Sequence, residues 1–363
     1  MILMNHSSFI DLKIAYKLLF PKHRFGIVCT SDGFIGKYLL MRLLGCIPTK
    51  KFVTDFNLIG DIKHMLFKKK TSVLMYPEAS YSFDGTATAL PRQLGALLKR
   101  LGVPVVFIKT EGAFTRDPLY NGLQIRKVNV SANIEVLLTK EQLESLSATE
   151  ISEILDTAFT FDAFKWQKDN KIKITEPFRA DGLERILYKC PHCLAEGKTI
   201  GKGTKLTCQS CGIVYEMDEY GSLSAKNGET LFSHVPDWYA WERQMVREEI
   251  ENNEYLLDVP VKIGVMIDYK SINFIGDGRL IHTKDGFSLV GADEKLNYNQ
   301  KARASYSLYA DYFWYEIGDV ICIGDNDALY YCFPPKEVPV AKVRLATEEI
   351  FKAEKKSKTE IKE

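Results

Sequence analysis

The chain has 363 residues, 46% of them hydrophobic and 26% charged, and its formal net charge is +1. This composition is typical of a globular protein and excludes a disordered chain, while the length predicts two or three domains. The sequence has no apolar run near the roughly 18 residues that cross a bilayer and no visible signal peptide, which excludes a membrane-spanning bundle.

Charge is divided unevenly along the chain. Residues 1–144 carry 20 Lys and Arg against 11 Asp and Glu, whereas the remainder carries 28 against 36. A basic N-terminal part suits an anionic partner such as a phosphorylated lipid, a thioester carrier or a membrane surface. Charge alone fits nucleic acid equally well, but no nucleic-acid motif accompanies it, so no nucleic-acid partner is expected.

The first stretch that carries chemistry is Asn5-His6-Ser7-Ser8-Phe9-Ile10-Asp11, between an apolar strand at 2–4 and a helical run. A histidine near neutral pKa accepts a proton from an alcohol, and a carboxylate on its other ring nitrogen fixes the tautomer. A plainer interpretation is also open. In it Ser8 and Asp11 form a capping box at the helix start, and His6 is a loop histidine.

Three further stretches follow in order, namely RLLGCIPTKK at 42–51, YPEASYS at 76–82 and VPVVFI at 103–108. With the opening stretch, they resemble the four ordered blocks of the glycerolipid (lysophospholipid) acyltransferase superfamily, to which the 1-acyl-glycerol-3-phosphate acyltransferases belong. In that family the blocks read Asn-His-x4-Asp, a Gly-x-Ile/Phe-Phe-Ile-x-Arg type segment, Phe-Pro-Glu-Gly-Thr-Arg-Ser and a Val-Pro-rich strand. The resemblance covers roughly residues 1–140.

The resemblance implies transfer of a fatty acyl group from acyl-CoA or acyl carrier protein to the hydroxyl of lysophosphatidic acid or a related glycerolipid, in phospholipid biosynthesis. His6 would be the general base and Asp11 would orient it, without a covalent acyl-enzyme. Glu78 would organise the acceptor site together with Lys50 or Lys51, which stand where the family places an arginine.

The third block departs from the family pattern, because Ala79, Ser80 and Tyr81 replace Gly, Thr and Arg. A tyrosine supplies no charge for a phosphate. Ser80 stays among the predicted substrate-binding residues, and Arg92 joins them if the chain folds back. Family members also have a membrane-associating helical segment and a first strand ahead of the first block. Since the block here starts at residue 5, a truncated or late-assigned start is expected.

An alternative function is a lipid-binding or scaffold protein that keeps the acyltransferase fold with weakened catalysis. The altered third block and the missing N-terminal segment favour it.

Residues 1–175 are expected to form the acyltransferase domain as an α/β layered structure, because strands alternate with helices. Strands are predicted at 24–30, 72–76, 103–108 and 128–138, and helices at 12–19, 36–45, 56–70, 93–101, 140–146 and 149–159. The run Phe67-Lys68-Lys69-Lys70 ends one helix, where lysines complement the helix dipole, which is a simpler explanation than a membrane patch.

Four cysteines form two C-x2-C pairs separated by fourteen residues, within a predicted zinc ribbon at 181–225: Cys190, Cys193, Cys208 and Cys211. Four thiolates satisfy tetrahedral zinc and leave no open position, so a structural metal is expected. His192, inside the first pair, is expected to be a bystander. The other four cysteines are scattered among apolar residues. That usage indicates a reducing compartment, and the protein is predicted to be cytoplasmic and peripheral on the cytosolic face of the membrane.

Residues 226–258 are predicted to be a helical connector, whose aromatic cluster at 238–241 packs one domain against another rather than entering lipid. Residues 259–355 are predicted to be β-rich, with strands at 261–267, 271–275, 279–282, 286–290, 305–308, 320–324 and 329–333 and a helix at 340–355. Turns such as 276–278 separate the strands. Seven strands and a helix suggest a small barrel of pleckstrin-homology type for docking, followed by a solvated tail at 355–363.

Overall fold

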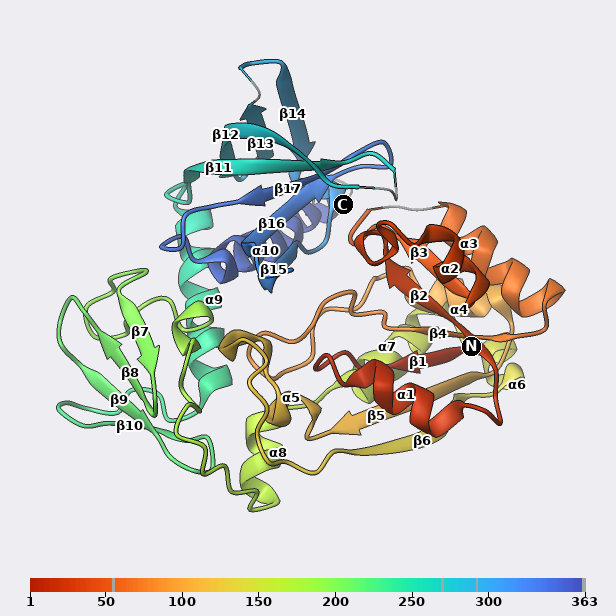
Figure 1. Ribbon diagram of the computed structural model, residues 1–363, viewed down its shortest axis with the longest axis horizontal. Coiled ribbons are helices and arrows are strands. Elements are labelled where there is room, and N and C mark those ends of the chain that lie inside the picture. Colours follow the sequence, from red (N-terminus) through yellow and green to blue (C-terminus); the bar gives the residue numbers. More distant parts are fainter. Residues whose placement is uncertain (54–55, 269–270, 292, 361–363) are drawn as a thin grey trace. The chain divides into compact units, whose positions relative to one another are not determined.

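The structure is a computed structural model that describes residues 1–53, 56–268, 271–291 and 293–360 (Figure 1). The chain forms two compact units. The first comprises Met1–Leu119 and Ile125–Asn170, and the second comprises Tyr120–Gln124 and Lys171–Glu363. The finer division into acyltransferase domain, ribbon, connector and β-rich domain stays a prediction.

The first unit is built on a six-stranded sheet in the order β3-β2-β4-β1-β5-β6. Its parallel strands are β1 (Ile2–Met4), β2 (Phe25–Thr30), β3 (Cys46–Thr49), β4 (Ser72–Met75) and β5 (Val105–Glu111), and β6 (Ser131–Leu138) pairs with β5 in the antiparallel sense. The short β1 lies between β4 and β5. The residues that follow β1 therefore emerge at the middle of the carboxyl edge of the sheet, which is where open α/β sheets bind ligands.

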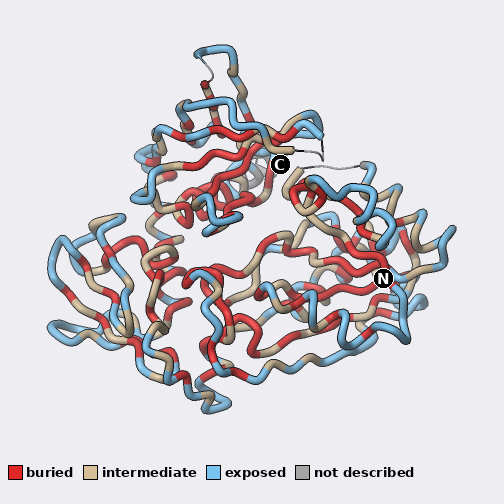
Figure 2. The backbone as a smooth tube through the Cα atoms, in the orientation of Figure 1, coloured by how far each residue is buried: buried red, intermediate tan, exposed pale blue. Residues whose placement is uncertain are grey.

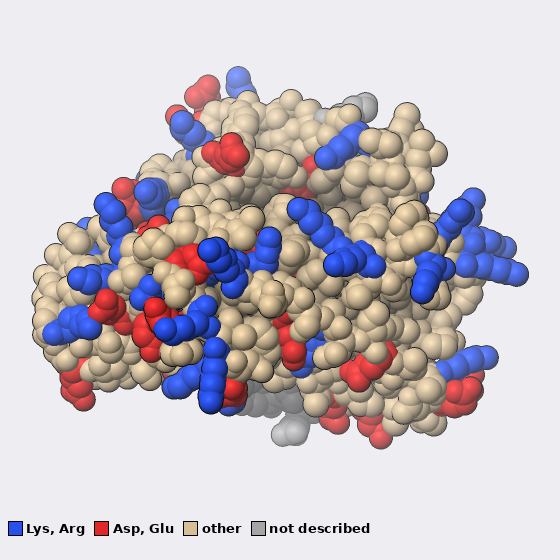
Figure 3. Space-filling view, turned by 60° about the horizontal axis from the view of Figure 1, so that its bottom comes forward, with Lys and Arg blue, Asp and Glu red and all other residues tan. Residues whose placement is uncertain are grey.

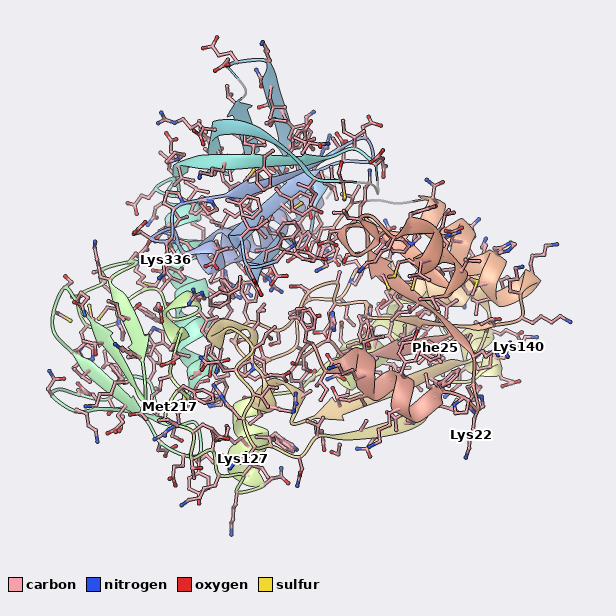
Figure 4. The ribbon with its side chains drawn as sticks, in the orientation of Figure 1. Lys22, Phe25, Lys127, Lys140, Met217 and Lys336 are labelled. Atoms are coloured by element: carbon pink, nitrogen blue, oxygen red, sulfur yellow. The ribbon has the colours of Figure 1, made fainter. Side chains whose placement is uncertain are left out.

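Helices pack on both faces of this sheet (Figure 1). Because side chains alternate along a strand, Leu3 of β1 joins a core with the helices on one face, while Ile2 and Met4 point to the opposite face. The helices of the Leu3 face are α3 (Phe56–Lys63), the π-helical turn η2 (His64–Lys68), α4 (Leu94–Leu101), α6 (Lys140–Ser145) and α7 (Ala148–Phe159). On the other face lies α1 (Asp11–Leu19), whose Tyr16 contacts Phe25 of β2 at 5.0 Å between ring centroids. Phe25 is labelled in Figure 4.

The predicted α/β layered structure is confirmed in this coarse form, and local signals explain its helix boundaries. Capping boxes start α6 and α7, with Thr139 paired to Gln142 and Ser147 paired to Glu150. The remaining short helices are η1 (Ser31–Phe34), α2 (Tyr38–Leu43), α5 (Ala113–Arg116), η3 (Leu119–Asn121) and α8 (Ala163–Asp169). Buried residues are concentrated on the strands and on the inner faces of the helices (Figure 2).

The second unit begins with a four-stranded antiparallel sheet in the order β10-β9-β8-β7. Its elements are η4 (Leu183–Arg185), β7 (Thr199–Lys202), β8 (Lys205–Cys208), β9 (Val214–Met217), β10 (Leu223–Ala225) and the long helix α9 (Val235–Glu251). Trp238 of α9 is buried, contacts Tyr215 at 5.0 Å and donates its indole N–H to the carbonyl of Lys189 at 3.0 Å. This aromatic residue therefore packs α9 against the ribbon.

A seven-stranded antiparallel sheet follows in the order β14-β13-β12-β11-β17-β16-β15. Its elements are β11 (Leu257–Met266), β12 (Asn273–Thr283), β13 (Gly286–Gly291), β14 (Leu296–Lys301), η5 (Ala302–Ala304), β15 (Tyr309–Trp314), β16 (Gly318–Gly324), β17 (Leu329–Phe333) and the helix α10 (Val340–Glu360). The prediction of a β-rich region with a C-terminal helix is confirmed. Within the described ranges, no helix is long and apolar enough to cross a membrane.

Four details of the predicted β-rich region are wrong. The predicted strands at 271–275 and 279–282 are one strand, β12, because a register shift between Ile263 and Gly264 and the positive φ of Gly276 (110°) absorb the predicted turn. The predicted strand at 305–308 precedes β15. The sequence does not predict β14, because the alternation of Leu296 and Tyr298 with asparagines is short and ends at the polar Gln300, and asparagine is uncommon in strands. Finally, α10 continues to Glu360, because nothing in the predicted tail breaks a helix.

Ion pairs tie α9, α10 and the ribbon together. Lys189, beside the first cysteine pair, lies 3.1 Å from Glu196 and 3.1 Å from Glu249 of α9. Lys342 of α10 contacts the same two carboxylates at 2.8 and 2.7 Å. Arg243 of α9 adds bonds to two glutamates of α10. These charged groups are largely withdrawn from water and satisfy one another. Separating one ion pair would leave a charge without a partner and is costly, so the network favours a single arrangement of the second unit.

Candidate functional site

A histidine and an aspartate meet at the carboxyl edge of the first unit's sheet. His6 Nδ1 lies 3.3 Å from Oδ2 of Asp11, the first residue of α1. The Asp11 carboxylate is fully buried and also accepts the backbone N–H groups of Ser7 at 2.7 Å and Ser8 at 2.9 Å. These donors and the helix N-terminus stabilise its negative charge. Asp11 is therefore positioned to hold the Nδ1–H tautomer of His6.

The other ring nitrogen of His6 remains available. His6 Nε2 has no hydrogen-bond partner among the described residues, and the side chain is 16% exposed. The capping-box interpretation holds only in part. Asp11 accepts the Ser8 N–H, but the Ser8 hydroxyl donates to Asp117 at 2.7 Å, and Ile10 is the N-cap without a side-chain cap. His6 is thus held by a carboxylate on one side and open on the other.

Two tyrosine rings enclose the imidazole. Tyr76 stacks on His6 with 4.2 Å between centroids and 23° between planes, and Tyr81 lies at 4.1 Å and 39°. Burial lowers the pKa of His6, the hydrogen bond and charge of Asp11 oppose this, and the charge of Lys51 lowers it further. His6 is therefore neutral at neutral pH and able to accept a proton, while the aromatic faces favour the imidazolium that forms.

Glu78 forms hydrogen bonds that hold the loop carrying His6 in place. One oxygen of its buried carboxylate accepts the His6 N–H at 2.9 Å, and the other accepts the N–H of Thr88 at 2.8 Å and its hydroxyl at 3.0 Å. Burial raises the pKa of Glu78 to about 7 against the opposing effect of these donors. The structure thus places Glu78 behind the histidine, joined to its backbone.

The other predicted substrate-binding residues lie at different distances from the histidine. Lys50 is nearly buried after β3, and Lys51 is half-buried and electrostatically coupled to His6. Ser80 is buried, and its hydroxyl donates to the carbonyl of Tyr81 at 3.2 Å. Arg92 is exposed ahead of α4 and is not among the described partners of His6, Asp11 or Glu78. The structure therefore brings Lys51 to the site and does not bring Arg92 into the hydrogen bonds around His6.

Two further residues belong to the site: Asn5, which the first block contains but for which no role was predicted, and Thr110, which was not predicted. Asn5 accepts the N–H of Thr110 at 2.8 Å and its hydroxyl at 3.1 Å, and the Thr110 hydroxyl lies 3.4 Å from Asp11. Thr110 is near the carboxyl end of β5, the neighbour of β1, so the rule that ligands bind at this edge could have pointed to it. Together they fasten the loop after β1 to the adjacent strand.

A cavity of about 270 Å³ opens beside this loop. Ser7 and Thr110 form one side, while Phe114 and Trp166 supply aromatic walls. Gly112 has a φ of 79°, and a Cβ there would lie 3.0 Å from the Trp166 ring, so glycine permits the close packing of this wall. The site therefore combines a polar edge with a partly apolar recess.

Ala79 has a left-handed backbone, with φ at 55°. This conformation costs L-residues roughly 1–2 kcal/mol but is free for glycine, which the resembled family has here. We expect Ala79→Gly to raise the free energy of unfolding by up to about 1 kcal/mol, since glycine's greater unfolded-chain entropy offsets part of the gain. Urea unfolding measures it. Ala87→Gly, at a position without positive φ, is the control and should destabilise, and a loss with Ala79→Gly would contradict the expectation.

The four cysteines of the second unit converge on one point. Their sulfur atoms lie within 4.8 Å of one another, with 3.7 Å between Cys190 and Cys211 and 3.7 Å between Cys193 and Cys208. A tetrahedral zinc with bonds of about 2.3 Å separates its sulfurs by about 3.8 Å, so the donor set fits zinc. His192 instead lies 3.0 Å from the Tyr215 hydroxyl.

The two cysteine pairs form matching knuckles. The residue after each pair, Leu194 or Gly212, has a left-handed φ, of 61° and 75°. Each donates its N–H to the carbonyl of the first cysteine of its pair, at 2.9 and 3.0 Å. Backbone N–H groups also donate to the sulfurs of Cys190, Cys193 and Cys211. Such donors stabilise thiolates, which is the ligand form that a metal requires.

Comparison with known proteins gives little. No family model matches the chain, and no curated protein matches it. Among solved structures, the chain is similar to the 1-acyl-sn-glycerophosphate (LPA) acyltransferase PlsC from Thermotoga maritima, with a TM-score of 0.31 and 15% identity. The match covers 44% of this chain and 64% of that chain, so less than two thirds of the solved protein is spanned.

Proposed function

We propose that the first unit is an O-acyltransferase that moves an acyl group from a thioester, acyl-CoA or acyl carrier protein, to the hydroxyl of lysophosphatidic acid or a related glycerolipid. The observation that carries this proposal is the His6–Asp11 pair at the carboxyl edge of the sheet, with Nδ1 held at 3.3 Å and Nε2 open. A pair of this kind serves as a general base for an alcohol.

In the proposed reaction, His6 Nε2 accepts the proton of the acceptor hydroxyl while the oxygen attacks the thioester carbonyl carbon. The C–S bond then breaks, and the thiolate takes the proton from the imidazolium. Asp11, which also accepts the backbone N–H groups of Ser7 and Ser8, stabilises the imidazolium between these steps. We propose direct transfer, as the resemblance implies. The Ser8 hydroxyl donates to Asp117 at 2.7 Å, so its proton is not directed at His6.

Charge and space around the pair support an amphipathic, anionic acceptor. Lys51 supplies a positive charge close to His6, and the recess lined by Phe114 and Trp166 adjoins the loop at Ser7. We propose Lys51, with Lys50, as the phosphate-recognising group and Glu78 as a positioning residue that acts through the His6 backbone. Ser80 and Arg92 stay weaker candidates for acceptor contacts.

Thiol release from acyl-CoA and from acyl carrier protein, each with and without lysophosphatidic acid, tests the reaction. Release that depends on the acceptor would support acyl transfer and would identify the donor. Release that is equal with and without acceptor would indicate a thioesterase and would contradict the proposal.

A lipid-binding protein with weakened catalysis is the second candidate, and one observation favours it. The Tyr81 ring lies 4.1 Å from the His6 ring, at the position where the resembled family has an arginine. Saturable lipid binding without thioester turnover, unaffected by Asp11→Asn, would support this candidate. Turnover that increases in Tyr81→Arg would indicate that the tyrosine only weakens an existing enzyme.

The pH dependence of catalysis follows from His6. Burial lowers its pKa below 6.5, so kcat/KM should rise with pH along a limb centred below 6.5 and be constant above it. Lys51→Gln removes a charge that lowers this pKa, so the limb should move to higher pH. Initial rates over a pH series measure the midpoint, with the exposed Lys13→Gln as control. A limb that stays in place in Lys51→Gln would contradict the proposed proximity.

We further propose that the cysteine cluster holds a structural zinc, with four thiolates and no open position. The two meanders of the seven-stranded sheet, joined through β11 and β17 and followed by α10, support a pleckstrin-homology-like docking module. A cytoplasmic protein, peripheral on the cytosolic face of the membrane and without a nucleic-acid partner, agrees with these proposals.

A further inference from the structure

The short helix α2 (Tyr38–Leu43) has no buried face. None of its residues is buried, and the leucines at 39, 40, 43 and 44 are 77%, 57%, 85% and 57% exposed. Single exposed leucines are common on soluble proteins and need no explanation. Four within six residues, however, form an apolar patch of the kind that marks an interaction surface.

Basic residues adjoin this helix. Arg42 of α2 lies 2.7 Å from Asp61 of α3, which brings the two helices side by side (Figure 1). The α3 helix continues into η2, where Phe67 is 49% exposed and is followed by the exposed Lys68, Lys69 and Lys70. At 1.5 Å per residue, Lys68 lies about 10 Å along the axis from Asp61. Residues 36–70 contain eight Lys and Arg against two Asp.

The α2 patch comprises the three leucines of α2, Leu44 directly after it, Phe67 and the three lysines at 68–70. Figure 3 shows Lys and Arg interspersed with Asp and Glu over much of the face in view. Exposed leucines on one helix, with exposed lysines at the end of the neighbouring helical segment, are the pattern of a surface that enters the headgroup region of an anionic bilayer.

We propose that the α2 patch binds the surface of an anionic phospholipid bilayer. The leucines enter the boundary between headgroups and acyl chains, and Lys68, Lys69 and Lys70 meet the phosphates. These lysines then bind lipid phosphates in addition to their favourable interaction with the helix dipole. This surface is separate from the His6–Asp11 pair, so its binding to lipid requires no acyl transfer.

Flotation of the full chain with lipid vesicles, with and without an anionic phospholipid, tests the proposal. Wild type should bind the anionic vesicles, less so as salt increases, and bind neutral vesicles weakly. Leu39→Ser/Leu43→Ser should weaken binding roughly tenfold or more, because two exposed leucines lose their burial in lipid. Lys68→Gln/Lys69→Gln/Lys70→Gln should do the same on anionic vesicles only.

The matched control is Leu256→Ser/Ile267→Ser, which changes two side chains that are 62% and 72% exposed in the second unit. It should bind as wild type does. Equal binding of wild type and the α2 variant would overturn the proposal, as would equal binding to neutral and anionic vesicles. Oligomers that form without vesicles and dissociate in the α2 variant would also overturn it, since a second copy would then cover the patch.

A turnover assay with monomeric, short-chain substrates separates this proposal from the proposed enzyme function. The α2 variant should keep wild-type rates there while losing vesicle binding. Loss of both in the α2 variant, with a native circular dichroism spectrum, would place these leucines in the site and overturn the proposal.

Discussion

Replacing His6 with alanine is expected to lower kcat/KM for acyl transfer by a factor of roughly 10²–10⁴, which is the usual contribution of a positioned general base. The chain should stay folded, because the imidazole lies in a loop and is held by one side-chain hydrogen bond and two ring contacts. Acceptor-dependent thiol release measures the rate, and thermal unfolding confirms that the variant is folded.

Asp11 should prove to act through His6. Asp11→Asn is expected to cost less than His6→Ala, and the double variant should be no slower than His6→Ala, because residues that act as a unit are not additive. His23→Ala changes an exposed histidine of the same unit and should leave the rate unchanged. Wild-type activity in His6→Ala would exclude the proposed mechanism, and additive losses in the double variant would separate Asp11 from the histidine.

The second large effect concerns the cysteine cluster. Replacing Cys208 with serine, or removing metal with a strong chelator, is expected to destabilise the second unit by several kcal/mol. Structural zinc contributes about 10 kcal/mol or more to the folding of small zinc modules. The loss should extend to α9, because Trp238 and Glu242 of that helix bind the backbone of Lys189, next to Cys190.

Three measurements check this expectation. Metal analysis should give one zinc per chain in the wild type and none in Cys208→Ser. Cobalt substitution should give the absorption spectrum of a tetrahedral thiolate site. Tryptophan fluorescence should change on chelation, because the buried Trp238 would lose its packing against the ribbon. Cys29→Ser in the first unit is the control and should keep its metal. An unchanged melting curve after complete chelation would contradict a structural role.

The contacts around His6 show how far sequence patterns reach. The five-residue step from His6 to Asp11 spans the end of a strand and the first turn of a helix, so local geometry alone brings the two side chains together. Thr110 in β5 and Tyr76, directly after β4, come from parts of the chain far from His6 in sequence. No local spacing encodes them, since they depend on the strand order β4-β1-β5.

Motif positions and side-chain roles were predictable to different degrees. Glu78 occupies the expected block, but its carboxylate bonds to the backbone of His6 and to Thr88, ten residues on, a role that only the tertiary structure reveals. The convergence of the four cysteines could be predicted from the sequence, because two C-x2-C pairs about fifteen residues apart are typical of a metal site. The strand β14 escapes prediction because only two apolar residues, Leu296 and Tyr298, mark its buried face, and the third position of that face is the polar Gln300.

Residues 120–124 bear on how this protein can be divided. They interrupt the first unit yet belong to the second, where Tyr120 is fully buried and donates its hydroxyl to the carbonyl of Arg179 at 3.2 Å. The chain therefore passes between the units three times, after residues 119, 124 and 170. A fragment ending at Asn170 would therefore expose Tyr120, and a fragment starting at Lys171 would lack a side chain that is buried in the second unit.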